Sequence, residues 1–211
     1  MNSFLPDHIA RLLQSGLPGE QSHLKMVPPG RSLYTAAEDR KRVKLSSVLI
    51  LLFPVAGEIY TCFVKRSAGL KYHPGQVSLP GGQVEEGESA EMAALRETQE
   101  EIGVSARDIR VLGRLSELFV QVSSYTVYPF VGWLDEQPEF VLNRDEAEKL
   151  ILFPVQRFLE RREIGYMELE TSTGLLEVPY YPCDGEIIWG ATAMILTEFL
   201  DLLGKPKLIP R

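Results

Sequence analysis

Short apolar runs separated by turn-rich segments predict the strands of this chain. The stretch "LSSVLILLF" (45–53) is a continuous apolar and β-branched run with the length of a buried strand. After the turn "PVAGE", the stretch "EIYTCFVKR" (58–66) alternates apolar and polar positions, which predicts a hairpin partner for the first strand. Extended segments are also predicted at 76–80, 109–118, 124–134 and 147–155, with a further hairpin through 166–181.

Helical periodicity appears between and around these runs. We expect helices at 4–13, 89–102, 155–162 and about 190–203. The N-terminal helix and a polar connector occupy about 1–44, and the connector ends in the basic cluster "EDRKRVK" (38–44). We interpret that cluster as a solvated loop, with a binding patch as the alternative. Strands interleaved with helices predict an α/β or α+β layer fold, and 211 residues suffice for one domain, 1–211.

Composition and charge narrow the classes of function. The chain is 45% hydrophobic and 24% charged, as globular proteins are, and its net charge of −7 argues against nonspecific nucleic-acid binding. Its longest apolar run, 48–56, has about half of the ~20 residues that a membrane span needs and contains Pro54. Cys62 and Cys183 lie far apart, and the first residues show no apolar signal segment. We therefore expect a reduced, cytoplasmic protein with no membrane partner.

One predicted helix carries Glu97, Glu100 and Glu101 within five residues, where like charges repel by a few tenths of a kcal/mol per pair. At ~100° per residue, the glutamates occupy an arc apart from the expected core stripe. The stripe consists of Leu95, Thr98 and Ile102 with Met92 nearby, and the glutamates lie beside the small residues Ala90, Ala93 and Ala94. Carboxylates are the hard ligands that Mg²⁺ or Mn²⁺ prefers, so a bound ion would neutralise them. The alternative is a solvated helix face on which Arg96 pairs with Glu100.

The spacing around the glutamates favours the metal site. In "GQVEEGESAEMAALRETQEEIGV" (82–104), fixed intervals separate Gly82, Glu88, the Arg96–Glu97 pair, the Glu100–Glu101 pair and the final Gly103. This pattern resembles the signature of the Nudix hydrolase family, with one departure, Thr98 at a position for a bulky aliphatic residue. Chance matches at seven such positions fall well below about one in a million per start point.

The resemblance implies a chemistry and a fold. Nudix hydrolases cleave a nucleoside diphosphate linked to another moiety by attack of water on phosphorus, and they use divalent metal ions. For this chain it implies a Nudix-type α/β/α sandwich with a mixed β-sheet and a requirement for Mg²⁺ or Mn²⁺. The implied metal ligands are Glu97, Glu100, Glu101 and the backbone carbonyl of Gly81. Arg96 would orient the glutamates, and Glu88 would fix the loop before the helix.

A second resemblance lies upstream. The stretch "FVKRSAGLKYHPGQVSLPGG" (63–82) is similar to the extra signature of the coenzyme A pyrophosphatase subgroup, with Lys71 in place of an arginine and Leu79 in place of a phenylalanine. Lysine keeps the charge but lacks bidentate geometry toward phosphate. The substrate-binding residues implied are Arg66, Ser67, Lys71, His73, Gly81 and Gly82. Solvated charges at Arg66 and Lys71 and plain loop packing at His73 are the alternatives.

Later segments extend the resemblance to roughly residues 40–203. It nominates Glu146, in "NRDEAEKL", as general base or further metal ligand, with a solvated loop as the alternative. Tyr180, Tyr181 and Trp189 either line a pocket or pack in the core.

The implied reaction is hydrolysis of coenzyme A or acyl-CoA to 3′,5′-ADP and (acyl-)4′-phosphopantetheine. Alternative substrates are ADP-ribose, NADH and dinucleoside polyphosphates, and a catalytically silent nucleotide-binding domain is the alternative from another class. The expected partner is thus a small nucleotide, and homodimers are common in the family.

Overall fold

The computed structural model describes residues 4–31, 43–70, 73–161, 163–171 and 174–204, and its centre is the strand predicted from the apolar run. Strand β1 (Lys44–Val55) is buried on both faces, with Leu49, Ile50 and Leu51 at 0% exposure. Its alternate side chains enter two different hydrophobic clusters, one on each side of the sheet. A continuous apolar run is the pattern of a strand covered on both faces.

The main sheet has eight strands and is mixed. β1 pairs antiparallel with β2 (Glu58–Arg66) through the predicted hairpin and parallel with β7 (Tyr125–Trp133). β5 (Arg110–Arg114) and β6 (Leu118–Val120) pair with β7, and β8 (Ala147–Pro154) pairs with β2. The short strands β3 (Val77–Ser78) and β4 (Gly81–Gln83) pair with β2 and β1. The central path is β3-β2-β1-β7-β5.

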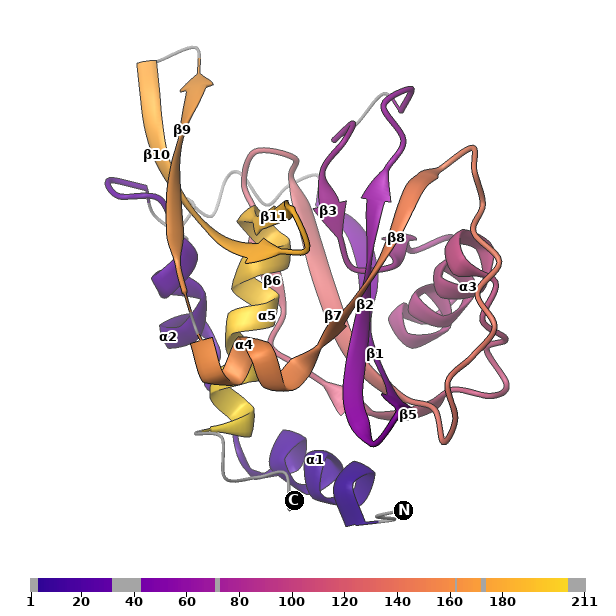
Figure 1. The fold of residues 1–211 in the computed structure, drawn as a ribbon. Coiled ribbons are helices and arrows are strands. Elements are labelled where there is room, and N and C mark those ends of the chain that lie inside the picture. The colour runs from indigo at the N-terminus through magenta and orange to yellow at the C-terminus, as the bar shows by residue number, and fades with distance from the viewer. Residues whose placement is uncertain (1–3, 32–42, 71–72, 162, 172–173, 205–211) are drawn as a thin grey trace.

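Helices cover the two faces of this sheet (Figure 1). α3 (Ala90–Ile102) lies on one face, against the cluster that contains Leu49 and Leu51. The other face packs against α5 (Gly190–Leu203) and α4 (Val155–Arg161), and α1 (Phe4–Ser15) closes the end where both termini lie. The result is the expected α/β/α sandwich.

A three-stranded sheet of β9 (Gly165–Thr171), β10 (Gly174–Cys183) and β11 (Glu186–Trp189) stands beside the main sheet, and the β9–β10 hairpin projects from it (Figure 1). Tyr181 is a core residue at 4% exposure and bonds Thr197 on α5. Of the two readings left open for this tyrosine, the structure supports core packing.

Some details differ from expectation. The glycine pair Gly81–Gly82, which follows the predicted extended segment 76–80 and lay outside every predicted element, belongs to strand β4, because its backbone pairs with β1. The connector contains a helical turn, α2 (Glu20–His23), followed by the 3₁₀ helix Leu24–Met26. Most of the basic cluster at 38–44 lies outside the described residues. No helix in the described part of the chain is long and apolar enough to cross a membrane.

Candidate active site

Arg96 is the hub of the acidic motif. Its guanidinium donates to Glu88 through Nε (3.2 Å) and Nη2 (2.8 Å), to Glu97 Oε1 (2.9 Å) and to Glu100 Oε2 (3.0 Å). Nη2 also donates to the carbonyl of Gln83 on β4 (3.1 Å). A planar guanidinium with five donors can hold several carboxylates at fixed angles. The spacing of the sequence motif thus becomes one network that ties α3 to β4.

Glu88 fixes the loop that leads into α3. Its Oε1 accepts from the backbone N–H of Glu85 (2.7 Å) while both of its oxygens accept from Arg96. The helix then begins after Ser89, whose side chain accepts from the N–H of Met92 (3.2 Å), and ends at Gly103 in the left-handed conformation. The acidic helix therefore has a fixed start and a fixed end.

Glu101 is the buried member of the acidic group. Its side chain is 2% exposed, whereas that of Glu100 is 52% exposed. Glu101 Oε2 accepts from the N–H of Gly81 at 3.1 Å. Burial raises the pKa of Glu101 to about 7, opposed by that hydrogen bond and by Arg66, and increased further by Glu97 and Glu146.

Glu97 and Glu146 add negative charge next to Glu101. Burial raises the pKa of Glu97, Arg96 lowers it, and the charges of Glu100 and Glu146 raise it. The charge of Glu146 raises the pKa of both Glu97 and Glu101. The structure therefore brings Glu146 near these carboxylates, although it lies 45 residues beyond Glu101 in the chain. A side chain at Gly82 would collide with Glu97, because its Cβ would lie 2.3 Å from the carboxylate.

Backbone hydrogen bonds hold the Glu146 loop in this place. The N–H of Asn143 donates to the carbonyl of Glu101 (2.9 Å), and the N–H of Ser67 donates to the carbonyl of Glu146 (2.9 Å). Asn143 Oδ1 also accepts from the N–H of Asp145 (3.1 Å), which forms an Asx turn. Asn143 is a positioning residue that the sequence reasoning missed, and the Asn-x-Asp turn pattern was the available signal.

Arg66 connects the upstream segment to the acidic group. Its Nη1 lies 3.7 Å from Glu101 Oε1, and its Nε is buried without a hydrogen-bond partner within the described residues. A buried donor without a partner is costly. The Arg66 side chain as a whole is 25% exposed, so its other donors can reach an anionic ligand. The geometry favours the functional interpretation of Arg66 over the solvated one.

The structure gives less support to two other predicted substrate-binding residues, His73 and Lys71. His73 is exposed, and its Nδ1 lies 3.1 Å from Gln76 Oε1 within the same turn. His73 thus makes a contact within its own turn, and its role in ligand binding stays a prediction. Lys71 lies outside the described residues.

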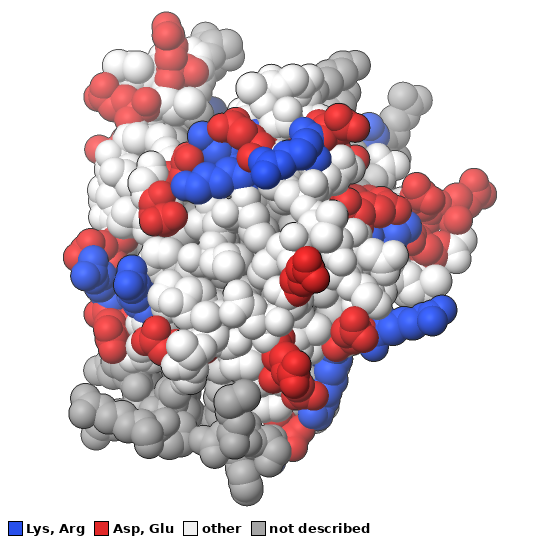
Figure 2. Space-filling view, turned by 45° about the vertical axis from the view of Figure 1, so that its right-hand side comes forward, with Lys and Arg blue, Asp and Glu red and all other residues white. Residues whose placement is uncertain are grey.

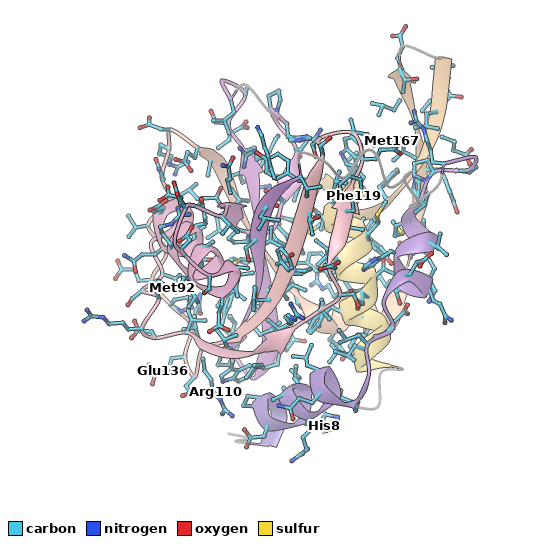
Figure 3. All side chains as sticks on the ribbon, turned by 180° about the vertical axis from the view of Figure 1, so that it is seen from behind. His8, Met92, Arg110, Phe119, Glu136 and Met167 are labelled. Atoms are coloured by element: carbon cyan, nitrogen blue, oxygen red, sulfur yellow. The ribbon has the colours of Figure 1, made fainter. Side chains whose placement is uncertain are left out.

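The expected burial of α3 needs correction. Met92, labelled in Figure 3, is 59% exposed and does not belong to the core stripe. Ala93 and Ala94, expected on the arc of the glutamates, are fully buried. Their small side chains let the helix approach the sheet closely, and this approach carries Glu101 into the interior.

The donor set fits a divalent cation. Within the described ranges, no three His, Cys, Asp or Glu side chains are already arranged to hold a metal ion. Gly81 donates to one oxygen of Glu101, and Arg96 donates to one oxygen each of Glu97 and Glu100. Glu97 and Glu101 nevertheless have raised pKa values, and negative neighbours contribute to both. A cation would relieve that repulsion. Glu97, Glu100 and Glu101 are the residues that would hold it.

Two other basic side chains of the main sheet, Lys65 and Lys149, have carboxylate partners. Lys65 Nζ pairs with Glu186 (3.0 Å), and Lys149 Nζ lies 3.7 Å from Asp184. Figure 2 shows basic and acidic side chains in contact along the upper part of one face.

Comparison with known proteins identifies the family to which this chain belongs. The NUDIX domain model matches residues 43–169. Among curated relatives, "Nudix hydrolase 3" of Caenorhabditis elegans is 35% identical over 74% of this chain and 72% of its own. Two proteins named as peroxisomal coenzyme A diphosphatases also match, ndx-8 of Caenorhabditis elegans (36% identical, 76% and 69% of the chains) and NUDT7 of Mus musculus (30%, 82% and 66%).

Solved structures agree on the fold. A MutT/nudix family protein from Enterococcus faecalis has a TM-score of 0.53 over 99% of this chain and 79% of its own, at 15% identity. The Nudix hydrolase RenU of M. smegmatis has a TM-score of 0.52 over 79% and 87%, at 18% identity. Together with the family match and the relatives above 30% identity, the chain belongs to the Nudix family and is a pyrophosphohydrolase.

Proposed function

We propose that this chain hydrolyses coenzyme A or its acyl thioesters to 3′,5′-ADP and (acyl-)4′-phosphopantetheine. The observation that carries the proposal is the junction of the two sequence signatures. Arg66, from the upstream segment, lies 3.7 Å from Glu101 of the acidic helix, and its buried Nε has no hydrogen-bond partner among the residues that the structure describes. The relatives named as coenzyme A diphosphatases, at 30% and 36% identity, support the same substrate class.

Each residue has a role in the proposed reaction. Nudix hydrolases generally use divalent metal ions, and we propose Mg²⁺ or Mn²⁺, which would neutralise the diphosphate and acidify the attacking water. Glu97, Glu100 and Glu101 would hold the cation, and Arg96 keeps Glu97 and Glu100 oriented. Arg66 donates to a phosphate oxygen, and Glu146 accepts the proton of the water. The water oxygen bonds to one phosphorus, the P–O bond from that phosphorus to the bridging oxygen breaks, and the bridging oxygen leaves with the other phosphate.

A substrate panel tests the proposal. The purified protein would be incubated with Mg²⁺ or Mn²⁺ and, in parallel, with coenzyme A, acetyl-CoA, ADP-ribose, NADH and diadenosine polyphosphates, and the products would be separated by chromatography. Release of 3′,5′-ADP, fastest from coenzyme A or its thioester and abolished by a chelator, is the expected result. Release of AMP from another compound at a higher rate would refute coenzyme A as the substrate and keep the hydrolase.

Location and assembly are separate proposals. We propose a reducing compartment, the cytoplasm, because Cys62 and Cys183 are buried free thiols whose pKa values burial raises to about 12. Fractionation with a tagged chain would test this location, and detection in an oxidising compartment would contradict it. The homodimer stays a prediction that light scattering can check.

A further inference from the structure

Gln83 on β4, Tyr125 on β7 and Lys44 on β1 form a group of polar and aromatic side chains. Neither sequence signature assigns these three residues to metal or substrate binding. The Tyr125 hydroxyl, at the start of β7, donates to Gln83 Oε1 at 3.0 Å. Lys44 Nζ, at the start of β1, lies 5.6 Å from the centre of the Tyr125 ring. Lys44 and Tyr125 are cross-strand partners in the parallel β1–β7 pair, so the sheet itself fixes their proximity.

This group is linked to the carboxylates through the backbone of β4 and Arg96. The carbonyl of Gln83 accepts from Arg96, which also binds Glu97, so Gln83 is two hydrogen bonds away from a proposed metal ligand. Along β4, Gln83 lies two residues, about 7 Å, beyond Gly81, which donates to Glu101. Because side chains alternate along a strand, Gly82 faces Glu97, and the Gln83 side chain projects from the other face of β4, where its Oε1 accepts from the Tyr125 hydroxyl.

The group has the donors and the charge to receive an anionic aromatic ligand. The described lysines Lys25, Lys65 and Lys149 each have a carboxylate within 4.0 Å, whereas Lys44 forms no ion pair in the described part of the chain. Gln83 is exposed, and its Oε1 is engaged by Tyr125, which leaves the two N–H donors of Nε2 for a ligand. Tyr125 offers a half-buried ring on which a base can stack.

We propose that Gln83, Tyr125 and Lys44 bind the nucleoside half of the substrate. The base stacks on the Tyr125 ring, the Gln83 amide donates to a ring nitrogen of a purine, and Lys44 pairs with a phosphate of the nucleotide. The proposal deepens the proposed function and rests on a nucleotide being the substrate. It does not require coenzyme A, since any adenine nucleotide linked through a diphosphate would present the same base.

A binding experiment that needs no turnover tests the base subsite. Equilibrium titration with AMP and with ribose 5-phosphate, which lacks the base, measures what the base contributes. We expect the wild-type protein to prefer AMP by about tenfold or more, the magnitude of a stacked base. Tyr125→Ala should lose most of that preference. Tyr125→Leu should also lose the preference for AMP. Because leucine keeps apolar bulk beside Val120, this variant distinguishes the loss of stacking from a folding defect.

Tyr166→Ala is the matched control, because Tyr166 is a 57% exposed tyrosine on the separate β9–β10 hairpin. It should keep the wild-type preference. Lys44→Gln should weaken 3′,5′-ADP binding by at least severalfold and leave the affinity for 4′-phosphopantetheine, the other half of coenzyme A, unchanged. A wild-type protein that does not distinguish AMP from ribose 5-phosphate, or a Tyr125→Leu variant that still does, would overturn the inference.

The outcomes separate this inference from the proposed function. If coenzyme A is not hydrolysed but AMP binding depends on Tyr125, only the proposed substrate fails. If coenzyme A is hydrolysed and Tyr125→Leu leaves both KM and AMP affinity unchanged, only the base subsite fails. The expected kinetic signature is a raised KM with a nearly unchanged kcat, since stacking on a remote base is the same in the ground state and the transition state.

Discussion

Glu101 shows at the scale of one residue how stability and activity oppose each other. A carboxylate at 2% exposure is expensive to ionise, and its neighbours Glu97 and Glu146 add to the cost. The N–H of Gly81 and the guanidinium of Arg66 offset only part of it. The folded protein without metal is thus destabilised at the atoms that a cation would use.

Glu101→Gln should stabilise the metal-free protein and abolish turnover. The pKa rises from 4.5 to about 7 on folding, so the folded chain holds this proton more tightly than the unfolded chain. The contribution of this carboxyl group to stability is therefore greatest below pH 4.5 and is lost as pH rises through about 7. At ~1.4 kcal/mol per pKa unit, the resulting penalty at pH 8 is at most about 3.5 kcal/mol. Urea unfolding at pH 8 and pH 5 should show a gain for the variant at pH 8 that shrinks at pH 5.

The same variant separates a metal ligand from a structural residue. Added Mn²⁺ should raise the unfolding midpoint of the wild-type protein by mass action and have little effect on Glu101→Gln. Turnover of the best substrate should fall by orders of magnitude while the circular dichroism spectrum stays native. Equal stabilisation of both proteins by Mn²⁺ would exclude Glu101 as a metal ligand.

Gly82→Ala should disable the site through Glu97 rather than through the fold. A Cβ at this position would lie 2.3–2.5 Å from the Glu97 carboxylate, which must move away from Arg96. We expect kcat to fall by at least tenfold, with a small change in the free energy of unfolding because a side chain can yield. Gly69→Ala is the control, since its Cβ would meet only Ser67 Oγ at 3.9 Å. Equal kinetics for both variants would show that Glu97 needs no fixed position.

The chemistry of single residues was predictable from the sequence, and their burial was not. Glu97, Glu100 and Glu101 share one helix, so their spacing alone placed them together. Which of them is buried depends on the strand that the helix packs against, and the sequence treated the three alike. Glu146 reaches the group from a loop and Arg66 from the end of β2, both distant from α3 in the sequence, so only the family resemblance could nominate them.

At the scale of elements, α3 depends on the boundary that Ser89 provides. Its side chain accepts from the N–H of Met92, one of the donors that the first helical turn leaves unpaired. Ser89→Ala should cost about 1 kcal/mol, or a melting temperature lower by about 2–4 °C for a chain of this size. Ser89→Asp should keep most of the stability, because aspartate also caps. Thermal unfolding would measure both, and an alanine variant as stable as wild type would mean that the cap is dispensable.

Strand prediction succeeded where the residue pattern was strong and failed where pairing alone made the strand. β1 and β2 follow apolar runs, and the observed β2 coincides with the predicted segment 58–66. β4 contains two glycines, which carry no strand signal, and forms because its backbone bonds Ser46–Val48 of β1. The helix α2 in the connector was not predicted, because four residues are too few to show helical periodicity.

At the scale of the whole molecule, a buried carboxylate on α5 joins three distant segments. Glu198 is 0% exposed and accepts from His23 Nε2 (2.9 Å), from the N–H of Gly19 (3.1 Å) and from the N–H of Ser116 (3.2 Å). It therefore fastens α2 and the β5–β6 connection to α5, on the face of the sheet opposite α3. Ser22 and Lys25 reinforce the contact by bonding Asp201 on the same helix.

This junction should make global stability depend on pH in the acid range. Burial alone would raise the pKa of Glu198, but the hydrogen bonds from His23 and Ser116 outweigh it and lower the pKa below 4.5. A depressed pKa contributes stability above pH 4.5, and this contribution is lost as pH falls through the folded value. Glu198→Gln should cost about 2 kcal/mol at pH 7, since the buried donors lose a charged acceptor. The difference from wild type should shrink steadily below pH 4.5.

Urea unfolding of both proteins between pH 7 and pH 3, in the absence of metal, would measure that difference. Glu136→Gln is the control, because Glu136 is an exposed carboxylate on the far side of the molecule from α5, labelled in Figure 3, and its variant should track wild type at every pH. A gap between wild type and Glu198→Gln that stays constant down to pH 3 would mean that the carboxylate contributes by shape and not by charge. The junction would then be insensitive to acid, and the loss of stability at low pH would have to come from other carboxylates such as Glu88, whose pKa Arg96 lowers.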